Sequence, residues 1–320
     1  KQKTAYEIGV RLVGSEMCIR DSCTVRKILF NGKKAFGVEI EREGDIFVEK
    51  GKEIILSGGA IGSPQLLMLS GIGPKQHLME KGIDVIHDSP GVGQNLRDHP
   101  QVRLIWEVKD EYEHLKDGSK RGATVAIRYT AEGSDLHNDM MVHHTATVPQ
   151  SFYMTDGEDM YKGIGMTACL YLQIGSGELL LRAPDPKVQP YLNYNYFREE
   201  EDLRRMRECV RLCAEVGEGT SYKAIVTKRV QPSDKELQDD DLLDLWIRKN
   251  SATSHHISST CKMGPESDPM AVVDQYGKVH GIENLRVADA SIMHDCVRAN
   301  TNVPSMMVGE KVAEFIMQGK

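Results

Sequence analysis

The chain has 320 residues, of which 40% are hydrophobic and 27% are charged, and its formal net charge at pH 7 is −7. This length can bury a substantial core in one large domain or two ordinary ones, and the acidic balance argues against a nucleic-acid partner, because phosphate binding requires a basic face. No apolar run approaches the roughly eighteen residues of a transmembrane segment, and seven cysteines without a CxxC pair favour free thiols in a reducing, cytoplasmic compartment.

Residues 1–22 do not resemble a natural protein segment. KQKTAYEI and LVGSEMCIRDS read as translations of two common short-read sequencing adapters, and an index between them keeps both in one reading frame. We therefore predict that residues 1–22 are not native and that the native chain begins near Cys23, in the middle of a longer protein. A targeting signal encoded further upstream cannot be assessed from this sequence.

The next segment predicts strands followed by two short helices. Apolar and polar side chains alternate in Val25–Phe30 and Ala35–Ile40, on either side of an Asn-Gly hairpin turn. The apolar run Glu53–Leu56 predicts a buried strand that leads into a glycine turn. A helix is predicted over Ser63–Leu69, where a proline stands in the first turn, and Lys75–Lys81 predicts a second helix.

From about residue 100 the pattern changes to strand-like stretches separated by polar loops, and then to charged amphipathic helices. The predicted strands are Val102–Val108, Met140–Val148 and Met166–Gln173, and the predicted helices are Arg198–Val216 and Lys235–Lys249.

Two pairs of side chains in this region have an ordinary structural interpretation. Cys209 and Cys213 share one helical face, which suits two small core residues better than a redox pair. His143 and His144 stand in an alternating stretch and should face opposite sides of a strand, so one of them could face a pocket. A buried histidine with an ordinary partner is the simpler expectation.

The last section returns to alternating strand and helix. Asn284–Ala288 predicts a short strand that ends at Asp289-Ala290-Ser291, where a carboxylate and small residues suit the binding of a ribityl or diphosphate group by backbone amides. Asn302-Val303-Pro304 begins a final helix to about Met317. The positive end of its dipole would favour negative charge that develops on a bound ring.

The stretch TSHHISSTCKMG (253–264) carries two adjacent histidines and a cysteine. A zinc site is disfavoured, because adjacent histidines on a strand point apart and His255, His256 and Cys261 have no second ligand cluster nearby. A Cys261 nucleophile would need a turn to bring its thiol back to the His256 imidazole. A single histidine base, acting with Asn300 and the helix start that follows, suits removal of a proton and a hydride from an alcohol.

Five ordered blocks resemble the glucose–methanol–choline (GMC) oxidoreductases, an FAD-dependent family that includes choline and alcohol dehydrogenases. The blocks are GAIGSPQLLMLSGIG (59–73), GVGQNLRDHP (91–100), HISSTCKMG (256–264), VVDQYGKVHGIENLRVADASIM (272–293) and NTNVPSMMVGEK (300–311). Five blocks in family order are a highly specific signal, and the similarity extends from about residue 24 to the end.

The resemblance implies an incomplete FAD-binding Rossmann-like α/β domain and an α+β substrate domain with a mostly antiparallel sheet flanked by helices. Residues 23–99 would form part of the FAD-binding domain, residues 100–250 the substrate domain, and residues 251–320 a return to the FAD-binding domain with the catalytic residues. The G-x-G-x-x-G turn that cradles the FAD diphosphate in the family is absent from this sequence. We therefore expect a C-terminal fragment that is inactive and poorly soluble by itself.

The resemblance also implies residue roles. His256 matches the catalytic base, and Asn300 matches the second active-site position, which is His or Asn in the family. Many members carry glycine where Ser259 stands. The positions expected to lie against FAD or its lid are Ala60, Asn95, Asp289, Ala290, Asn302 and Val303.

The implied reaction is oxidation of an alcohol to an aldehyde or ketone, in which hydride passes to flavin N5. His256 would take the hydroxyl proton and Asn300 would orient the alkoxide. The expected partners are a small-molecule alcohol and an electron acceptor, either oxygen or a quinone, and no metal is expected. Two alternatives remain open: a lyase of the same fold that keeps flavin structurally, and a non-catalytic binding domain in which His256 is only packed.

Overall fold

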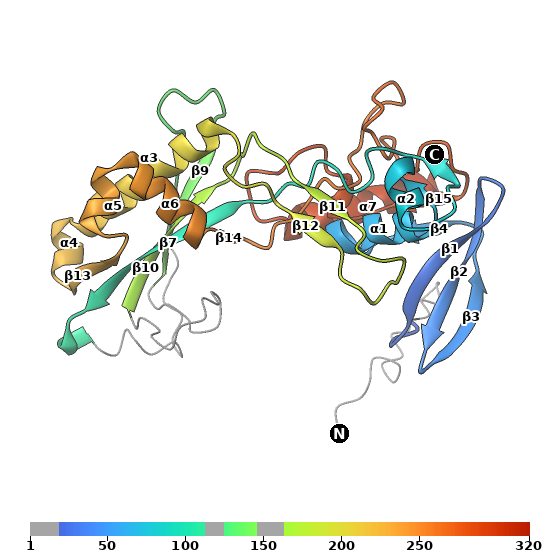
Figure 1. Ribbon diagram of the computed structural model, residues 1–320, viewed down its shortest axis with the longest axis horizontal. Helices are drawn as coiled ribbons and strands as arrows, with labels where there is room; N and C mark the ends of the chain where they lie inside the picture. The colour runs from blue at the N-terminus through green and yellow to red at the C-terminus, as the bar shows by residue number, and fades with distance from the viewer. Residues whose placement is uncertain (1–18, 113–124, 146–162) are drawn as a thin grey trace.

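The described chain forms two lobes that meet at a narrower junction, and the molecule is elongated (Figure 1). The computed structural model describes residues 19–112, 125–145 and 163–320. One lobe, here called the α1 lobe, contains both the first and the last parts of this chain. The other, here called the sheet lobe, contains most of the middle.

The α1 lobe begins with an antiparallel sheet of β1 (Thr24–Asn31), β2 (Lys34–Arg42) and β3 (Asp45–Lys50). Asn31 pairs with Lys34 across the Asn-Gly turn. Gly32 in that turn has a φ of +61°, a conformation that glycine adopts without steric cost. The predicted strand pair and its hairpin turn are therefore confirmed.

Two segments far apart in the chain form a parallel pair in this lobe. β4 (Ile54–Leu56) lies beside β15 (Leu285–Val287), with Leu285 opposite Ile54. Helix α1 (Gly59–Leu69) follows the first strand, and the 3-10 helix η3 (Ala290–Ile292) follows the second. Because the strands are parallel, both helices start at the same edge of the pair.

Helix α1 begins at Gly59, earlier than the predicted start at Ser63, and ends at Leu69 as predicted. Pro64 therefore lies inside the helix, and its missing N–H leaves the carbonyl of Ala60 without its helical donor. The hydroxyl of Thr260 donates to that carbonyl at 2.7 Å. The sequence around Pro64 does not reveal that Thr260 replaces the missing donor. The prediction therefore places the helix start too late.

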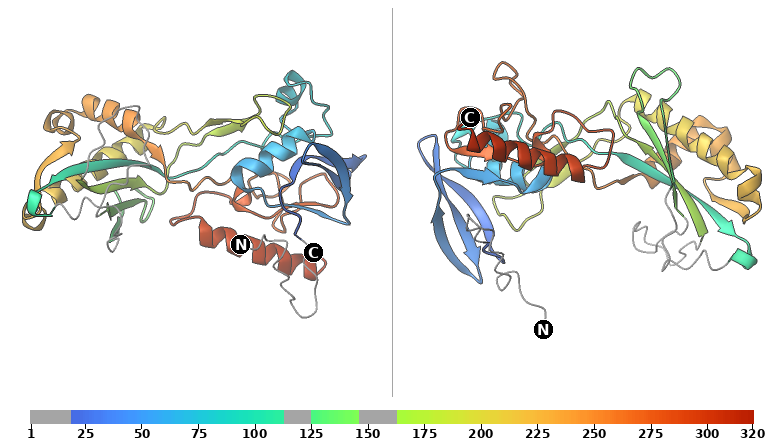
Figure 2. Two further views of the ribbon diagram at one scale, coloured as in Figure 1. Left: turned by 90° about the horizontal axis from the view of Figure 1, so that it is seen from below. Right: turned by 180° about the vertical axis from the view of Figure 1, so that it is seen from behind.

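The other elements of the α1 lobe are short, apart from the last helix. They are β5 (Ile72–Gly73), α2 (Lys75–Glu80), β6 (His87–Asp88), β11 (Glu178–Leu180), β12 (Tyr191–Asn193) and α7 (Asn302–Met317). Leu179 of β11 packs in the same core as α1, although it falls within the predicted 100–250 substrate segment. Figure 2 shows α7 lying along one side of this lobe, and Val312 is the buried residue of that helix.

The sheet lobe is built on a six-stranded antiparallel sheet with the order β13-β7-β10-β9-β8, and β14 pairs with the start of β7. The strands are β7 (Pro100–Val108), β8 (Ala126–Tyr129), β9 (Met140–Thr145), β10 (Gly163–Leu170), β13 (Val226–Gln231) and β14 (Ala252–Thr253). The prediction of a strand over 166–173 is shifted, because the amides of Tyr171 and Leu172 both turn to the carbonyl of Asp139.

Four helices accompany this sheet: α3 (Glu200–Gly217), α4 (Thr220–Lys223), α5 (Asp234–Gln238) and α6 (Asp240–Asn250). The prediction of one helix over 235–249 is wrong. Asp239 has an extended backbone that ends α5, and its carboxylate accepts the N–H of Leu242 at 3.1 Å to begin α6. Within the described residues, no helix combines the length and the apolar character needed to cross a membrane.

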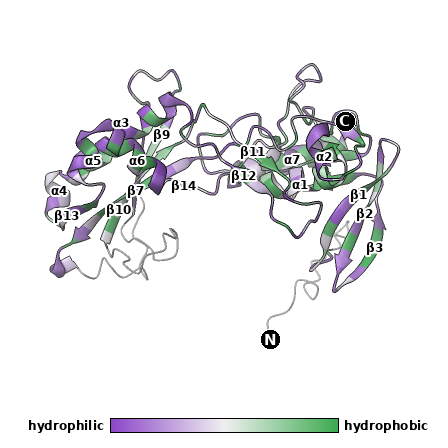
Figure 3. Ribbon diagram, in the orientation of Figure 1, coloured by the Kyte–Doolittle hydropathy of each residue, from purple (hydrophilic) through white to green (hydrophobic). Residues whose placement is uncertain are grey.

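Each lobe has its own hydrophobic core, and hydrophobic residues occur along the ribbon of both lobes (Figure 3). Trp106, Met206 and Trp246 belong to the core of the sheet lobe, which also contains Cys209 and Cys213 as predicted. Because the cores are separate, the connections between the lobes are strand ends and loops. Side chains from both lobes can meet at this junction.

Candidate active site

His256 lies at the junction of the two lobes. It is the third residue after β14, and the nearby Ser254 donates to the carbonyl of His99 from its backbone N–H at 3.2 Å and from its hydroxyl at 2.7 Å. These two bonds hold the loop after β14 against His99, the residue that precedes β7. They place His256 beside His99, although the two residues are far apart in the chain.

The rings of His256 and His99 are in direct contact. Their Nδ1 atoms are 2.9 Å apart, and the two ring planes are inclined at 73°. Tyr171 stacks on His99 with ring centroids 4.2 Å apart and an interplanar angle of 17°. His99 and Tyr171 are both buried, so this stacking fixes the plane of the His99 ring.

His143 and His144 lie on opposite faces of β9, as predicted. The Nε2 atom of His143 is 3.4 Å from the hydroxyl of Tyr171, whereas His144 packs edge-on against Tyr222. His143 therefore belongs to the cluster around His256. The guanidinium carbon of Arg128 lies 5.6 Å from the Tyr171 ring centroid and brings a positive charge to this cluster.

Asp98 holds the backbone of His256. Its Oδ1 atom accepts the N–H of His256 at 3.0 Å, and its Oδ2 atom accepts the hydroxyl of Tyr196 at 2.5 Å. Asp98 is buried, so both oxygens require such donors. Burial and the charge of Asp98 raise the pKa of Tyr196, which keeps the hydroxyl protonated as a donor.

Both histidines are neutral near pH 7. Burial lowers the pKa of His256 below 6.5, and the charge of Asp98 acts in the opposite direction. Burial lowers the pKa of His99 to about 3, with the charge of His256 acting in the same direction as burial. A neutral imidazole is the form that can accept a proton.

The residues after His256 connect the elements of the α1 lobe. The N–H groups of Ser259 and Cys261 donate to the carbonyls of Ala290 and Ser291 at 3.1 and 2.8 Å. Ser259 has a φ of +71°, in the left-handed region that favours glycine. This conformation accounts for the glycine that the resembling family often carries at that position.

Asp289 lies at the start of α1. Its Oδ2 atom accepts the N–H of Gly59 at 3.0 Å and the hydroxyl of Ser63 at 2.5 Å, and its Oδ1 atom accepts the N–H of Ser291 at 2.7 Å. These bonds engage both oxygens of the buried carboxylate. Asp289 thus joins the ends of β4 and β15, and any ligand here would meet mainly the backbone around it.

The structure brings some of the predicted residues together and leaves others apart. Ala60 and Ala290 both bond to the segment after His256, and the Asn95 amide donates to the carbonyl of His294 at 3.3 Å. Asn302 and Val303 are exposed at the start of α7. Asn300 is also exposed, and among the described residues no hydrogen bond or ring contact joins it to His256.

Cys261 is poorly placed to act as a nucleophile. It is fully buried, and burial raises the pKa of its thiol, with the charge of Asp289 adding to that effect. A search of residues 19–112, 125–145 and 163–320 finds no group of three or more His, Cys, Asp or Glu side chains that could hold a metal ion.

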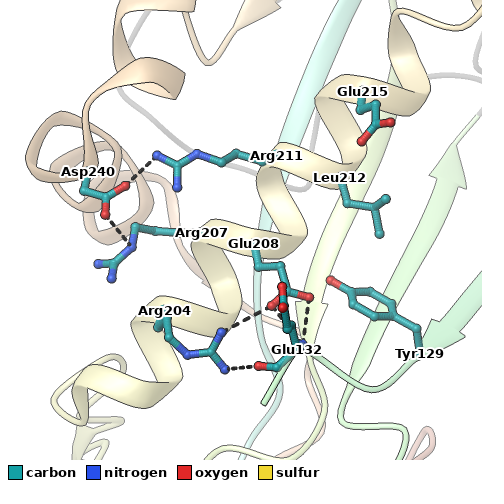
Figure 4. A pocket seen from close by; sticks show the side chains of 9 residues that line it. All are labelled: Tyr129, Glu132, Arg204, Arg207, Glu208, Arg211, Leu212, Glu215 and Asp240. Atoms are coloured by element: carbon teal, nitrogen blue, oxygen red, sulfur yellow. Dashed lines mark hydrogen bonds and ion pairs between the residues drawn. The ribbon is translucent and has the colours of Figure 1, made fainter. Parts of the chain in front are cut away.

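A concavity of about 620 Å³ lies on the outer face of α3 in the sheet lobe, away from His256 (Figure 4). Arg204, Arg207 and Arg211 line it from successive turns of the helix. Each of them is paired with carboxylates, as Arg211 is with Asp240 at 2.5 Å. This surface is a solvated network of ion pairs in which each of the three arginines already has a carboxylate partner.

Sequence reasoning did not identify His99, Asp98 or Tyr171 as members of the site. The adjacent Asp98 and His99 stand in the GVGQNLRDHP block and are the signal that could have found them. The sequence around Tyr171 contains no pattern that predicts a role in the site. Tyr171 lies beside His99 only because the chain turns after the end of β10.

Comparisons with known proteins indicate the family to which the chain is similar. Two family models, both described as GMC oxidoreductase, match residues 1–101 and residues 175–309. The oxygen-dependent choline dehydrogenase of Rhizobium etli (strain CIAT 652) is 36% identical in an alignment of 314 positions, gaps included, that covers 91% of this chain and 56% of that protein. The protein of the same name from Brucella canis is 38% identical over 312 aligned positions, and that alignment also covers 91% of this chain and 56% of that protein.

Among solved structures, a formate oxidase matches with a TM-score of 0.81 and 26% sequence identity. The match covers 93% of this chain and 60% of that one. The chain thus spans little more than half the length of the relatives that it matches.

Proposed function

Because the chain belongs to the GMC oxidoreductase family, we propose that it supplies the catalytic residues for FAD-dependent oxidation of an alcohol to an aldehyde or ketone. FAD is the cofactor of this family. The proposal concerns the whole enzyme, since the chain spans 56% of the length of its relative from Rhizobium etli. His256 is the proposed base and Asn300 the proposed second active-site residue.

The contact between His256 and His99 is the observation that carries this proposal. A neutral histidine with one ring nitrogen held at 2.9 Å by a fixed partner presents its other nitrogen in a defined direction. Its backbone is held by a buried carboxylate. A merely packed histidine does not need both constraints, whereas a base needs them to stay aligned with its substrate.

The residues at the two helix starts fit one part of an FAD molecule. Helix α7 begins without a side-chain cap, whereas at the start of α1 the Asp289 carboxylate already accepts the N–H of Gly59. Both dipoles are positive at these starts, and the amides there that have no side-chain acceptor can still donate. Such donors suit phosphate oxygens or a ring that gains negative charge. The sequence contains no G-x-G-x-x-G turn, and we propose that this part of the FAD site comes from chain beyond these residues.

In the proposed reaction His256 accepts the hydroxyl proton of the alcohol on Nε2, because His99 engages Nδ1. Asn300 donates a hydrogen bond to the substrate oxygen as it becomes an alkoxide. The chemistry that FAD would supply when bound is acceptance of a hydride from the carbinol carbon. The final electron acceptor in this proposal is oxygen or a quinone.

Replacement of the base tests the proposal. We expect His256→Ala in the flavin-loaded enzyme to slow anaerobic flavin bleaching by a primary alcohol about 10²- to 10⁴-fold, with unchanged flavin content. His144→Ala, on the opposite face of β9, is the matched control and should bleach at the wild-type rate. Wild-type bleaching by His256→Ala would exclude His256 as the base, and a wild-type enzyme that no alcohol bleaches would favour the lyase.

A further inference from the structure

Arg128 is an exposed positive charge beside the candidate site. Its guanidinium carbon lies 5.6 Å from the centroid of the Tyr171 ring, and the same centroid lies 6.3 Å from that of the His256 ring. The guanidinium carbon and the His256 ring centre can be no further apart than the sum of these two distances, about 12 Å. Arg128 is therefore within reach of a small molecule that contacts His256.

The strand register places Arg128 on the sheet face opposite helix α3. Arg128 of β8 lies opposite Met141 of β9, which lies opposite Cys169 of β10, and residues directly opposite each other share a face. Met141, Cys169 and Tyr171 form a small buried cluster on this face. The neighbouring Val142 points the other way, into the core that α3 covers. Arg128 thus shares a face with Tyr171 and has no part in the main core of the sheet lobe.

The same face carries a second arginine. Arg103 of β7 lies opposite Thr167, which in turn lies opposite His143. Burial lowers the pKa of His143, and the positive charge of Arg128 acts in the same direction. None of the described residues that the register places around Arg128 carries a carboxylate, and these are Ala126, Met141, His143, Thr167, Cys169, Gln101 and Arg103.

The charges at the site are unevenly engaged. Within residues 19–112, 125–145 and 163–320, no carboxylate forms an ion pair with Arg128. The ring of Tyr171 contacts its guanidinium, but N–H groups at the edge of the guanidinium can still bind a planar anion in bidentate fashion. Asp98, in contrast, already accepts the N–H of His256 and the hydroxyl of Tyr196. The described part of the site therefore suits an anionic ligand better than a cationic one.

From this arrangement we propose that Arg128 selects an alcohol that carries an anionic group, which it binds while the hydroxyl of the alcohol lies at His256. The inference rests on the proposed function and names a substrate class for it. A hydrogen bond of about 2.9 Å at each end leaves space within the 12 Å limit for a hydroxy acid of roughly three or four carbons. This class is opposite in charge to choline, the alcohol in the name of the relatives, because Arg128 repels a quaternary ammonium group.

Three alcohols of different charge test the proposal in the flavin-loaded enzyme. We expect kcat/KM for anaerobic flavin bleaching to be about 10- to 100-fold higher for 3-hydroxypropionate than for the neutral 3-hydroxypropionamide, and lowest for choline. 2-Hydroxyethyl phosphate distinguishes the two sources of the anion, since a kcat/KM above that of the acid identifies a phosphate. Equal values for the acid and the amide, or a preference for choline, would overturn the proposal.

Variants of Arg128 assign the preference to this side chain. Arg128→Gln should lower kcat/KM for the acid to that for the amide and leave the amide unchanged, and Arg128→Glu should make choline a better substrate than the acid. Arg182→Gln is the matched control, because Arg182 lies 6.0 Å from the ring centroid of Tyr191 in a similar contact but belongs to the α1 lobe. It should keep the wild-type preference. An equal loss for all three alcohols in Arg128→Gln would show a structural role and contradict the proposal.

Binding of compounds without a hydroxyl group separates this proposal from the proposed function. Ligand-observed NMR of the full chain compares the dissociation constants of propionate and propionamide. We expect propionate to bind about 10-fold more tightly or better, and Arg128→Gln to remove the difference. Equal binding of the two compounds by the wild type would exclude Arg128 as an anion-binding residue. If no alcohol of any charge bleaches the flavin, the proposed function fails, while the propionate comparison still decides whether Arg128 binds an anion.

Discussion

At the scale of single residues, the site depends on buried polar groups whose partners come from other segments. His99 and Asp98 precede β7, and both reach His256 after an intervening chain of more than 150 residues. Thr260 donates to Ala60 in the same way, within the α1 lobe but from a segment 200 residues away in the chain. Each of these groups is costly to bury without its partner, so the loss of one partner should affect the fold as well as the chemistry.

The low pKa of His99 predicts acid sensitivity. The unfolded chain binds a proton at this residue below pH 6.5, whereas the folded chain resists it until about pH 3. Between these values the unfolded state binds more protons, so the free energy of unfolding falls as the pH falls, by at most about 1.4 kcal/mol per pH unit for this group.

Urea unfolding at pH 7 and pH 4.5 measures this effect. The stability of His99→Asn should fall less between the two pH values than that of the wild type. His137→Asn removes an exposed histidine and should keep the wild-type difference. An unchanged difference in His99→Asn would show that His99 is not the acid-sensitive group.

At the scale of elements, the helix α3 packs on the sheet through small residues as well as large ones. Gly217 ends this helix, and a Cβ atom there would lie 2.2 Å from the ring of Trp106. Arg205, in the same helix, is fully buried and bonds to Asp139 at 2.7 Å and to Asp202 at 2.6 Å. The helix thus has one permitted position against the sheet.

Substitution of two helical glycines tests this packing. Gly217→Ala should destabilise the fold by about 1–3 kcal/mol, because the ring of Trp106 or the helix must move. Gly309→Ala in α7 meets nothing within 4 Å and should stabilise by about 0.5–1 kcal/mol through helix propensity. Urea denaturation measures both values, and a neutral Gly217→Ala would contradict the packing described here.

At the scale of the whole molecule, two lobes with separate cores meet at the candidate site. The α1 lobe also exposes apolar surface, most clearly on α7, where Val303, Met306 and Met307 are 67%, 56% and 59% exposed. Their spacing places them together on one helical face. A groove of about 500 Å³, lined by Ile54, Leu56 and Leu66 among others, adds to this apolar surface.

This apolar face predicts self-association of the chain. The double variant Met306→Lys, Met307→Glu should remain monomeric at higher concentration than the wild type, because it interrupts the face without touching a core. Leu245→Lys, at an exposed position on α6, is the control and should change little. Sedimentation velocity measures the outcome, and equal association of all three proteins would exclude α7 as the contact.

Much of the fold could be predicted from the sequence, because the signals involved are local. Alternating side chains around an Asn-Gly turn determine β1 and β2, and the charged amphipathic pattern determines α3. The predictions that were wrong have two causes. In one case a hydrogen bond from a distant residue replaces a lost helical bond, and in the other a helix cap interrupts a segment whose apolar spacing predicts one continuous helix. Pro64 is tolerated inside α1 only because of Thr260, and Asp239 divides a periodic segment into two helices.

The sequence by itself determined the family and pointed to His256, because the ordered blocks preserve residue types whose chemistry is specific. Only the tertiary structure brought His99, Asp98 and Tyr171 to His256. The physical reason is that a histidine's protonation and tautomer depend on burial and on hydrogen-bond partners. These partners lie at the starts and ends of strands that are far apart in the chain. No local sequence pattern predicts that they come into contact.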